Sequence, residues 1–297
     1  MIDLRPPARR VAQRLAIAAL AVLALPATAA CTASTSTPSP PSASQQPPPS
    51  APPACPVQPR PVLPQLCALA AAITAVPADS HPGPHIEVDS ELWARSTDRL
   101  LGSREVWRHT KGRPATLTER RAPGPVGLTR PPNASERARL ARAEPVPASG
   151  DPQALVPEPI LVDPRALAAQ LAAHAPPQAH TQTLLSNLSR MAAQQYLNRG
   201  QRAAVLIVLA TVDGVHYAGP TRDIAGRSGV AVTVTSARST WQIIVDPTTG
   251  ELLSYTETIT AGYRRGIWAI RLYLSRSRHH TPGPVLAQAS GPWAEAR

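Results

Sequence analysis

Apolar and polar residues alternate with a period of two in two parts of the chain. The first part holds alternating runs at residues 85–89, 90–96, 102–109 and 115–121, and the second at residues 215–220, 221–224, 230–235, 240–245, 251–260 and 266–274. A period of two places successive side chains on opposite faces of a strand. Asp246–Gly250 lies between two of these runs and is typical of a hairpin connection, because proline presets φ and glycine accepts the left-handed site. The pattern therefore predicts antiparallel hairpins in both parts.

Helical periodicity occupies the segments before and between these strands. We expect helices at residues 62–76, 163–175, 179–197 and 201–212. Asp163 is a good N-cap and Pro164 suits the first helical position. Together with the hairpins, these helices predict an α+β fold: a curved antiparallel sheet, half-barrel-like, with helices packed on one face.

The N-terminal residues 1–30 have the pattern of a secretory signal peptide. Arginines precede an apolar run at residues 15–25, and small residues follow it. The run is shorter than the roughly 20 residues that span a bilayer. Cys31 then stands where bacterial lipoproteins carry their lipidated cysteine, although Thr28 replaces the usual Leu or Val. We expect lipidation of Cys31 and anchoring to the outer leaflet of the cell membrane, with ordinary cleavage and secretion as the alternative.

Composition divides the remaining chain. The sequence holds 36 prolines and no phenylalanine, and its prolines concentrate in two places. Residues 31–61 read as a disordered Ser/Thr/Pro-rich tether, and residues 122–160 as a disordered loop, because both have too few apolar groups to offset the entropy of ordering. We therefore expect a single α+β domain at residues 62–274, followed by a disordered tail at residues 275–297.

Three cysteines and a net charge of +11 limit the chemistry. With Cys31 acylated, Cys55 and Cys67 are an even pair in an oxidising compartment, and either a disulfide joins them or both stay as free thiols. No metal-ligand spacing occurs, and we expect no cofactor. The positive charge suits anionic headgroups or wall polymers, but a solvated basic surface explains it equally. Export makes a nucleic-acid partner improbable.

Two turn motifs carry a resemblance to a protein family. Asp223, Gly226, Arg227 and Gly229–Val232 match a "DxxGRxGVAV" hairpin, and Asp246–Leu253 matches a "DPxTGxLL" hairpin. The chain thereby resembles an uncharacterised actinobacterial family of secreted or membrane-anchored proteins, often linked to sigma-factor genes, over about residues 62–274. Its predicted layers are also similar to the half-barrel carriers of lipoproteins and lipids in the bacterial envelope, which at fold level implies an apolar groove.

Candidate site residues follow from that implied groove. Trp93, Trp107, Trp241 and Tyr255 lie on predicted strands, and Trp93 and Trp107 are placed to meet as a cross-strand pair. The alternative is that all four are core. No nucleophile elbow or phosphate loop occurs, so we expect no catalytic residues and no enzyme. The first hypothesis is an exported cell-surface lipoprotein that binds an apolar or amphiphilic ligand, such as a lipid, or senses envelope state. The second is an interaction module for an envelope protein or wall polymer, and the third a secreted hydrolase.

Overall fold

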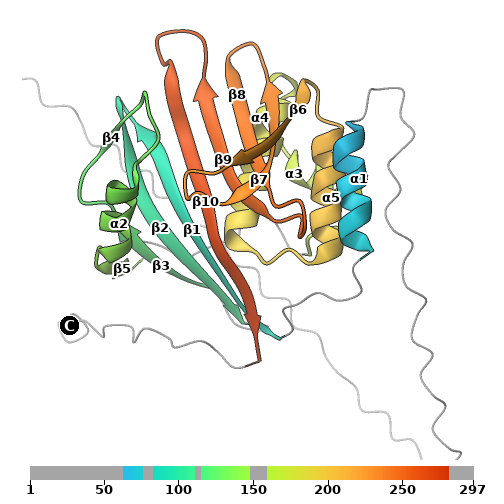
Figure 1. Ribbon diagram of the computed structural model, residues 1–297, viewed down its shortest axis with the longest axis horizontal. Helices are drawn as coiled ribbons and strands as arrows, with labels where there is room; N and C mark the ends of the chain where they lie inside the picture. The colour runs from blue at the N-terminus through green and yellow to red at the C-terminus, as the bar shows by residue number, and fades with distance from the viewer. Residues whose placement is uncertain (1–62, 76–82, 111–114, 148–158, 281–297) are drawn as a thin grey trace, which may run out of the picture. The chain divides into compact units, whose positions relative to one another are not determined.

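The computed structural model describes residues 63–75, 83–110, 115–147 and 159–280, which all belong to one compact unit, Ser50–Arg297. The predictions for the signal peptide and for the whole tether, with Cys31 and Cys55, lie outside these residues. Within them the predicted α+β fold is confirmed. Ten strands form one large antiparallel sheet, and helices pack against it (Figure 1).

The strand order in the sheet is β5-β3-β2-β1-β10-β9-β8-β7-β6, and β4 pairs with β2 outside this path. The bounds are β1 His85–Ser96, β2 Arg99–Thr110, β3 Thr116–Arg121, β4 Val126–Gly127, β5 Pro145–Pro147, β6 Val215–Arg222, β7 Ser228–Thr235, β8 Ser239–Val245, β9 Leu252–Ile259 and β10 Gly266–His279. β10 lies between β1 and β9. The two alternating regions of the sequence therefore join into one sheet through β10, the last strand of the described residues.

β10 is longer than its alternation suggests. We expected the strand to end at residue 274 and a disordered tail to begin at 275, but β10 continues to His279. The reason is a partner strand: residues 275–279 pair with β1, from Ser275 opposite Asp89 to His279 opposite His85. The rest of the predicted tail, from residue 281, lies outside the described residues.

Four α-helices and one 3₁₀ turn cover one face of the sheet. They are α1 Pro64–Thr74, α3 Pro164–Leu171, η1 Pro177–Ala179, α4 His180–Gln194 and α5 Arg199–Ala210. Asp163 caps α3 as predicted, accepting a hydrogen bond from the Ala166 amide. α5 is buried from Arg202 to Ala210, and it shares the main core with Val232, Ile243 and Tyr255 of the sheet. In the described part of the chain, no helix is both long and apolar enough to cross a membrane.

The opposite face carries a second, smaller core and the helix α2 Ala134–Arg142. Residues 122–147 were expected to be part of a disordered loop, but they form β4, α2 and β5. Val126 and Leu140 are the reason, because both are fully buried against Trp93 and Leu100 of the sheet. The prediction of helices on one face therefore missed α2. Residues 148–158 of that loop lie outside the described residues.

Candidate functional site

The four aromatic candidates are each between 1% and 5% exposed, and they fall on both faces of the sheet. Trp93 belongs to the small core beside α2, whereas Trp241 and Tyr255 belong to the main core beneath α4 and α5. The expected Trp93–Trp107 pair does not form. In the register of β1 and β2, Trp93 lies opposite Gly102, and Trp107 lies opposite Val88. The structure therefore does not bring the four residues into one groove.

Trp107 lies on the helix-covered face with its neighbour His109. The two rings stack with centroids 6.1 Å apart and planes inclined by 13°. His109 Nε2 is 2.5 Å from the Gln194 carbonyl oxygen at the C-terminal end of α4. Trp107 therefore lies at the sheet–helix junction, and its indole nitrogen has no hydrogen-bond partner there.

Trp241, Tyr255 and Glu257 form a buried polar cluster within the main core. Trp241 lies directly opposite Glu257 on β8 and β9, and the Tyr255 hydroxyl donates to Glu257 Oε2 at 3.2 Å. Burial raises the pKa of Glu257, while the Tyr255 hydroxyl and the Trp241 indole lower it by less. Burial and the Glu257 charge raise the pKa of Tyr255. Neither Glu257 Oε1 nor Trp241 Nε1 has a hydrogen-bond partner of good geometry.

Sequence reasoning missed Glu257, although the chain held a signal for it. Glu257 lies two residues after Tyr255 and two before Ile259, so the alternation places it on the same face of the strand as these apolar side chains. An acid at an inward position of a strand indicates a buried carboxyl. What the arrangement can do chemically is hold a proton on Glu257 at a pH where a solvated glutamate has lost it.

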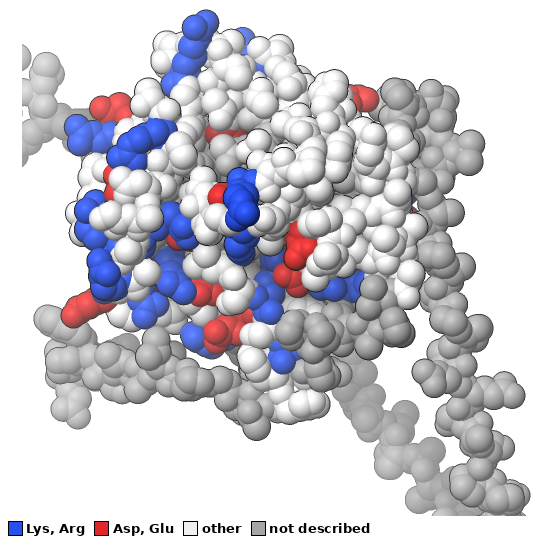
Figure 2. All heavy atoms as spheres, viewed as in Figure 1, with Lys and Arg blue, Asp and Glu red and all other residues white. Residues whose placement is uncertain are grey.

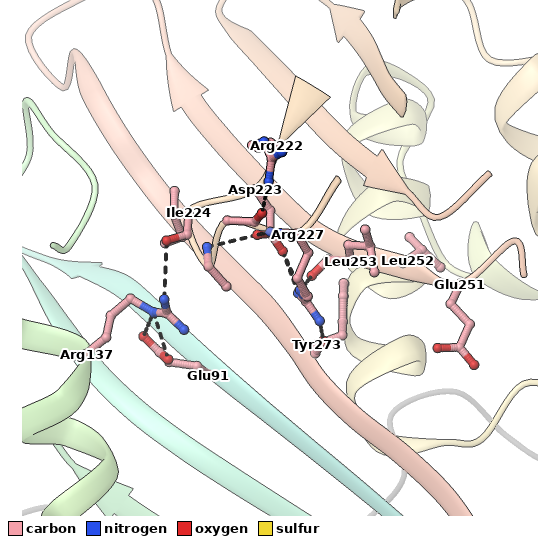
Figure 3. A network of polar contacts seen from close by, with 12 residues as sticks. Glu91, Arg137, Arg222, Asp223, Ile224, Arg227, Glu251, Leu252, Leu253 and Tyr273 are labelled. Atoms are coloured by element: carbon pink, nitrogen blue, oxygen red, sulfur yellow. Dashed lines mark hydrogen bonds and ion pairs between the residues drawn. The ribbon is translucent and has the colours of Figure 1, made fainter. Parts of the chain in front are cut away.

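The "DxxGR" motif builds a turn against the opposite face of the sheet (Figure 3). Asp223 accepts hydrogen bonds from the Ala225 and Arg227 amides, and Gly226 adopts φ +84°. The Arg227 guanidinium pairs with Asp223 at 2.6 Å and donates to the carbonyls of Leu253 and Tyr273 at 2.7 and 2.6 Å.

Those two carbonyls mark the place where β9 and β10 separate. The last residue pair between β9 and β10 is Ser254 opposite Leu272, and Leu253 and Tyr273 are the next residues beyond it. From the other face, Arg276 donates to the neighbouring Leu252 carbonyl at 3.1 Å. The two arginines therefore satisfy the carbonyls that the parting strands leave free, and the motif has a structural role.

Arg137 of α2 reaches across the same face to this turn (Figure 3). Its Nε lies 3.1 Å from Glu91 Oε1, and its Nη1 donates to the Ile224 carbonyl at 3.3 Å. Glu91 is buried and also accepts from the Trp93 indole at 2.5 Å. We call Glu91, Trp93, Arg137 and Ile224 the clasp, because they join the two ends of the sheet over β1 and β10.

The "DPxTG" motif also forms a turn rather than a reactive group. Asp246 Oδ1 accepts from the Thr248 amide at 2.7 Å and from the Thr248 hydroxyl at 2.6 Å. Burial raises the pKa of Asp246, but these hydrogen bonds outweigh it and hold the pKa below its ordinary value. Gly250 adopts φ +72°, and a Cβ there would lie 2.5 Å from Ile73 Cδ1 of α1. The hairpin end therefore packs closely against α1.

The remaining chemical predictions meet the structure in part. Cys67 is partly buried on α1 and disulfide-bonded, and its partner lies outside the described residues, so the Cys55–Cys67 pairing stays a prediction. The described residues contain no group of three or more His, Cys, Asp or Glu that could hold a metal ion.

Comparison with known proteins adds little to this geometry. No family model and no curated protein matches the chain. Among solved structures, the chain is similar to one titled "Crystal structure of MucB", at 11% identity and a TM-score of 0.30, over 74% of this chain and 59% of that one. The chain thus spans about three fifths of the length of that structure. The resemblance to the actinobacterial family stays a prediction.

Proposed function

We propose that the chain is an exported, non-enzymatic protein of the cell envelope that acts by binding a macromolecular partner at its surface. The packing of Trp93, Trp107, Trp241 and Tyr255 carries this proposal. All four are interior side chains, and they belong to both faces of the sheet. An enclosed apolar ligand needs aromatic or aliphatic side chains left free to line a cavity. Their burial therefore favours the interaction module over the carrier of an apolar ligand.

The export and anchoring in this proposal rest on the N-terminal sequence pattern and Cys31. Fractionation of cells that express the full chain tests them. We expect the wild type in the membrane fraction and open to protease on intact cells, and the Cys31→Ala variant in the medium. Recovery of the wild type from the cytosol would contradict export, and unchanged membrane association of Cys31→Ala would contradict lipidation.

Native mass spectrometry of the chain purified from a bacterial host distinguishes the two binding hypotheses. For Cys31→Ala we expect the mass of the processed polypeptide alone, because the interior is occupied by its own side chains. A lipid that co-purifies in stoichiometric amount, and that Trp241→Ala removes, would instead support the carrier hypothesis.

A further inference from the structure

Three loops are joined at one end of the sheet. They are the β1–β2 turn, the β7–β8 connection and the β9–β10 loop (Figure 1). Arg95 donates to the Thr97 carbonyl at 2.8 Å and to the Arg264 carbonyl at 2.6 Å, which binds the first loop to the third. The Thr260 amide donates to the Arg238 carbonyl at 2.8 Å, which binds the second to the third. The loops therefore present one fixed surface.

This end of the sheet displays an aromatic ring among arginines. We define the tip surface as Arg99, Arg238, Tyr263, Arg264 and Arg265, all of which are exposed. Tyr263 is 91% exposed, the largest value among the exposed apolar side chains of the described residues. The Arg264 guanidinium carbon lies 5.4 Å from the centre of its ring.

Charge at the tip surface is strongly one-sided. Four of its five residues are arginines, and Asp98 offsets one of them through a 3.9 Å ion pair with Arg99. Basic side chains project from the upper edge of the described unit, where these loops lie (Figure 2). An exposed tyrosine beside arginines suits an anionic membrane interface, since aromatic rings sit at headgroup level and each nearby arginine is attracted to anionic lipid.

The N-terminal end of the described unit lies at this same end of the sheet. The Leu63 amide donates to the Ala210 carbonyl at the C-terminal end of α5, at 3.1 Å. From there the chain enters β6, whose first residue, Val215, pairs with Val234 near the end of β7. The β7–β8 connection, with Arg238, follows directly. A chain anchored through its N-terminal residues is therefore attached on the side that carries the tip surface.

We propose that the tip surface rests on the anionic outer face of the membrane to which the chain is anchored. This proposal rests on the proposed function for export and anchoring, and it adds a contact between the folded unit and the membrane to the binding of a macromolecular partner. Arg264 and Arg265 bind lipid phosphates, and Tyr263 enters the headgroup layer. The anchor holds the unit near the bilayer, and the tip surface sets which face turns toward it.

Vesicle binding by the unlipidated chain tests the proposal. The full chain with Cys31→Ser, exported and processed by a bacterial host, is mixed with phosphatidylcholine vesicles with and without phosphatidylglycerol, and the bound fraction is measured by co-sedimentation. We expect binding to the anionic vesicles alone, and binding that weakens with added salt. Absence of binding to anionic vesicles at low salt overturns the proposal.

Paired charge removals separate the tip surface from the general positive charge. Arg264→Gln with Arg265→Gln should weaken binding about 25-fold, because each arginine near the bilayer contributes roughly five-fold. The matched control, Arg165→Gln with Arg190→Gln, removes two exposed arginines from α3 and α4. Arg165 lies five residues after Ile160, whose carbonyl accepts a hydrogen bond from the Gln201 side chain in the first turn of α5. Ala210, beside the tip surface, is at the other end of that helix. Equal loss in the two double variants overturns the proposal, because it shows diffuse charge attraction from a solvated basic surface.

Variants of Tyr263, binding to isolated cell wall and localisation in cells complete the test. The Tyr263→Ser variant should bind anionic vesicles more weakly than the wild type, without a blue shift in tryptophan fluorescence. The Tyr263→Trp variant should keep its binding, and its tryptophan fluorescence should shift to the blue when it binds the vesicles. If the protein binds isolated cell wall and not vesicles, and the Arg264→Gln, Arg265→Gln double variant loses the binding to cell wall, the membrane is not the partner. A wild type found in the cytosol that still binds vesicles would contradict the proposed function. A wild type found at the membrane that does not bind vesicles would contradict only the proposed role of the tip surface.

Discussion

Arg227 donates hydrogen bonds to the backbone of two strands and pairs with Asp223, whose side chain has no exposed surface. Removal of the guanidinium leaves the buried Asp223 carboxylate without its cation and the Leu253 and Tyr273 carbonyls without this donor. We expect Arg227→Met to lower the free energy of unfolding by about 3 kcal/mol. Chemical denaturation measures it, with Arg222→Met as the control, since Arg222 is exposed and makes one bond to the Gly226 carbonyl. Equal effects of the two variants would show that the network is not stabilising.

Glu257 gives the stability of the protein a pH dependence of known sign. Its pKa is raised from 4.5 in the folded protein, chiefly by burial. The unfolded chain therefore loses this proton at a lower pH than the folded chain does. The unfolded state binds fewer protons in that window, so the contribution of Glu257 to the free energy of unfolding falls as the pH rises from about 4.5 through the folded pKa.

The variant Glu257→Gln should remove that pH dependence. Above the window we expect it to be about 1 kcal/mol more stable than the wild type, and below about pH 4.5 to match it. Thermal unfolding across the pH range measures the difference. Glu251→Gln is the contrasting control, because Glu251 pairs with Arg202 and Arg276, and its removal should destabilise. Destabilisation by both variants at high pH would refute a raised pKa for Glu257.

At the scale of elements, β2 approaches the Trp93 ring through Gly102. A Cβ at Gly102 would lie 2.7 Å from the Trp93 ring. We expect Gly102→Ala to cost about 2 kcal/mol and to change the fluorescence of the tryptophans, because the ring must move within a packed core. Gly127→Ala is the control, since a Cβ there meets nothing within 4 Å. An unchanged stability for Gly102→Ala would mean that the small core is loosely packed.

Helix α2 supplies a second element-scale prediction. Leu140 is its one buried residue, and it packs in the cluster of Trp93 and Leu100. We expect Leu140→Ala to destabilise the protein by about 3 kcal/mol and to increase amide exchange throughout residues 122–143. Leu101→Ala, which shortens a half-exposed side chain on the adjacent strand, should do neither. If the wild type already exchanges freely over residues 122–143, the expectation of disorder was right.

The elements differ in how far the sequence predicts them. Alternation of apolar and polar residues located the central strands of both regions, and Asp163 located the start of α3. Helix α2 was not predicted because composition averages over a whole segment. The segment is ordered by two of its residues, Val126 and Leu140, which pack against Trp93 far away in the sequence. The last residues of β10 escaped because their partner is β1, and long-range pairing leaves no local signal.

The candidate site was less predictable than the fold. Trp93 and Trp107 both lie on strands, as expected, but their faces depend on a register that the length of the β1–β2 turn fixes. A register change of one residue moves every side chain to the other face. The clasp joins Arg137 to Glu91 and Ile224, which are 46 and 87 residues away, so local periodicity cannot indicate it.

For the whole molecule, the clasp predicts coupling between distant segments. Arg137→Met leaves the buried Glu91 carboxylate without its cation, and we expect a loss of about 3 kcal/mol. Amide exchange should also rise in the turn at residues 223–227, because the Ile224 carbonyl loses its donor. Arg139→Met, an exposed change in the same helix, is the control. Exchange that rises in α2 alone would show that the clasp does not couple the two ends.

The central place of β10 has a consequence for the order of events during synthesis. β1 and β9 each pair with β10, so neither has this neighbour until residues 266–279 have been synthesised. A nascent chain that lacks this strand has two open strand edges in place of a finished sheet. The sheet is therefore completed only when residues 266–279 have left the ribosome, and until then the edges of β1 and β9 stay open to pairing with other strands.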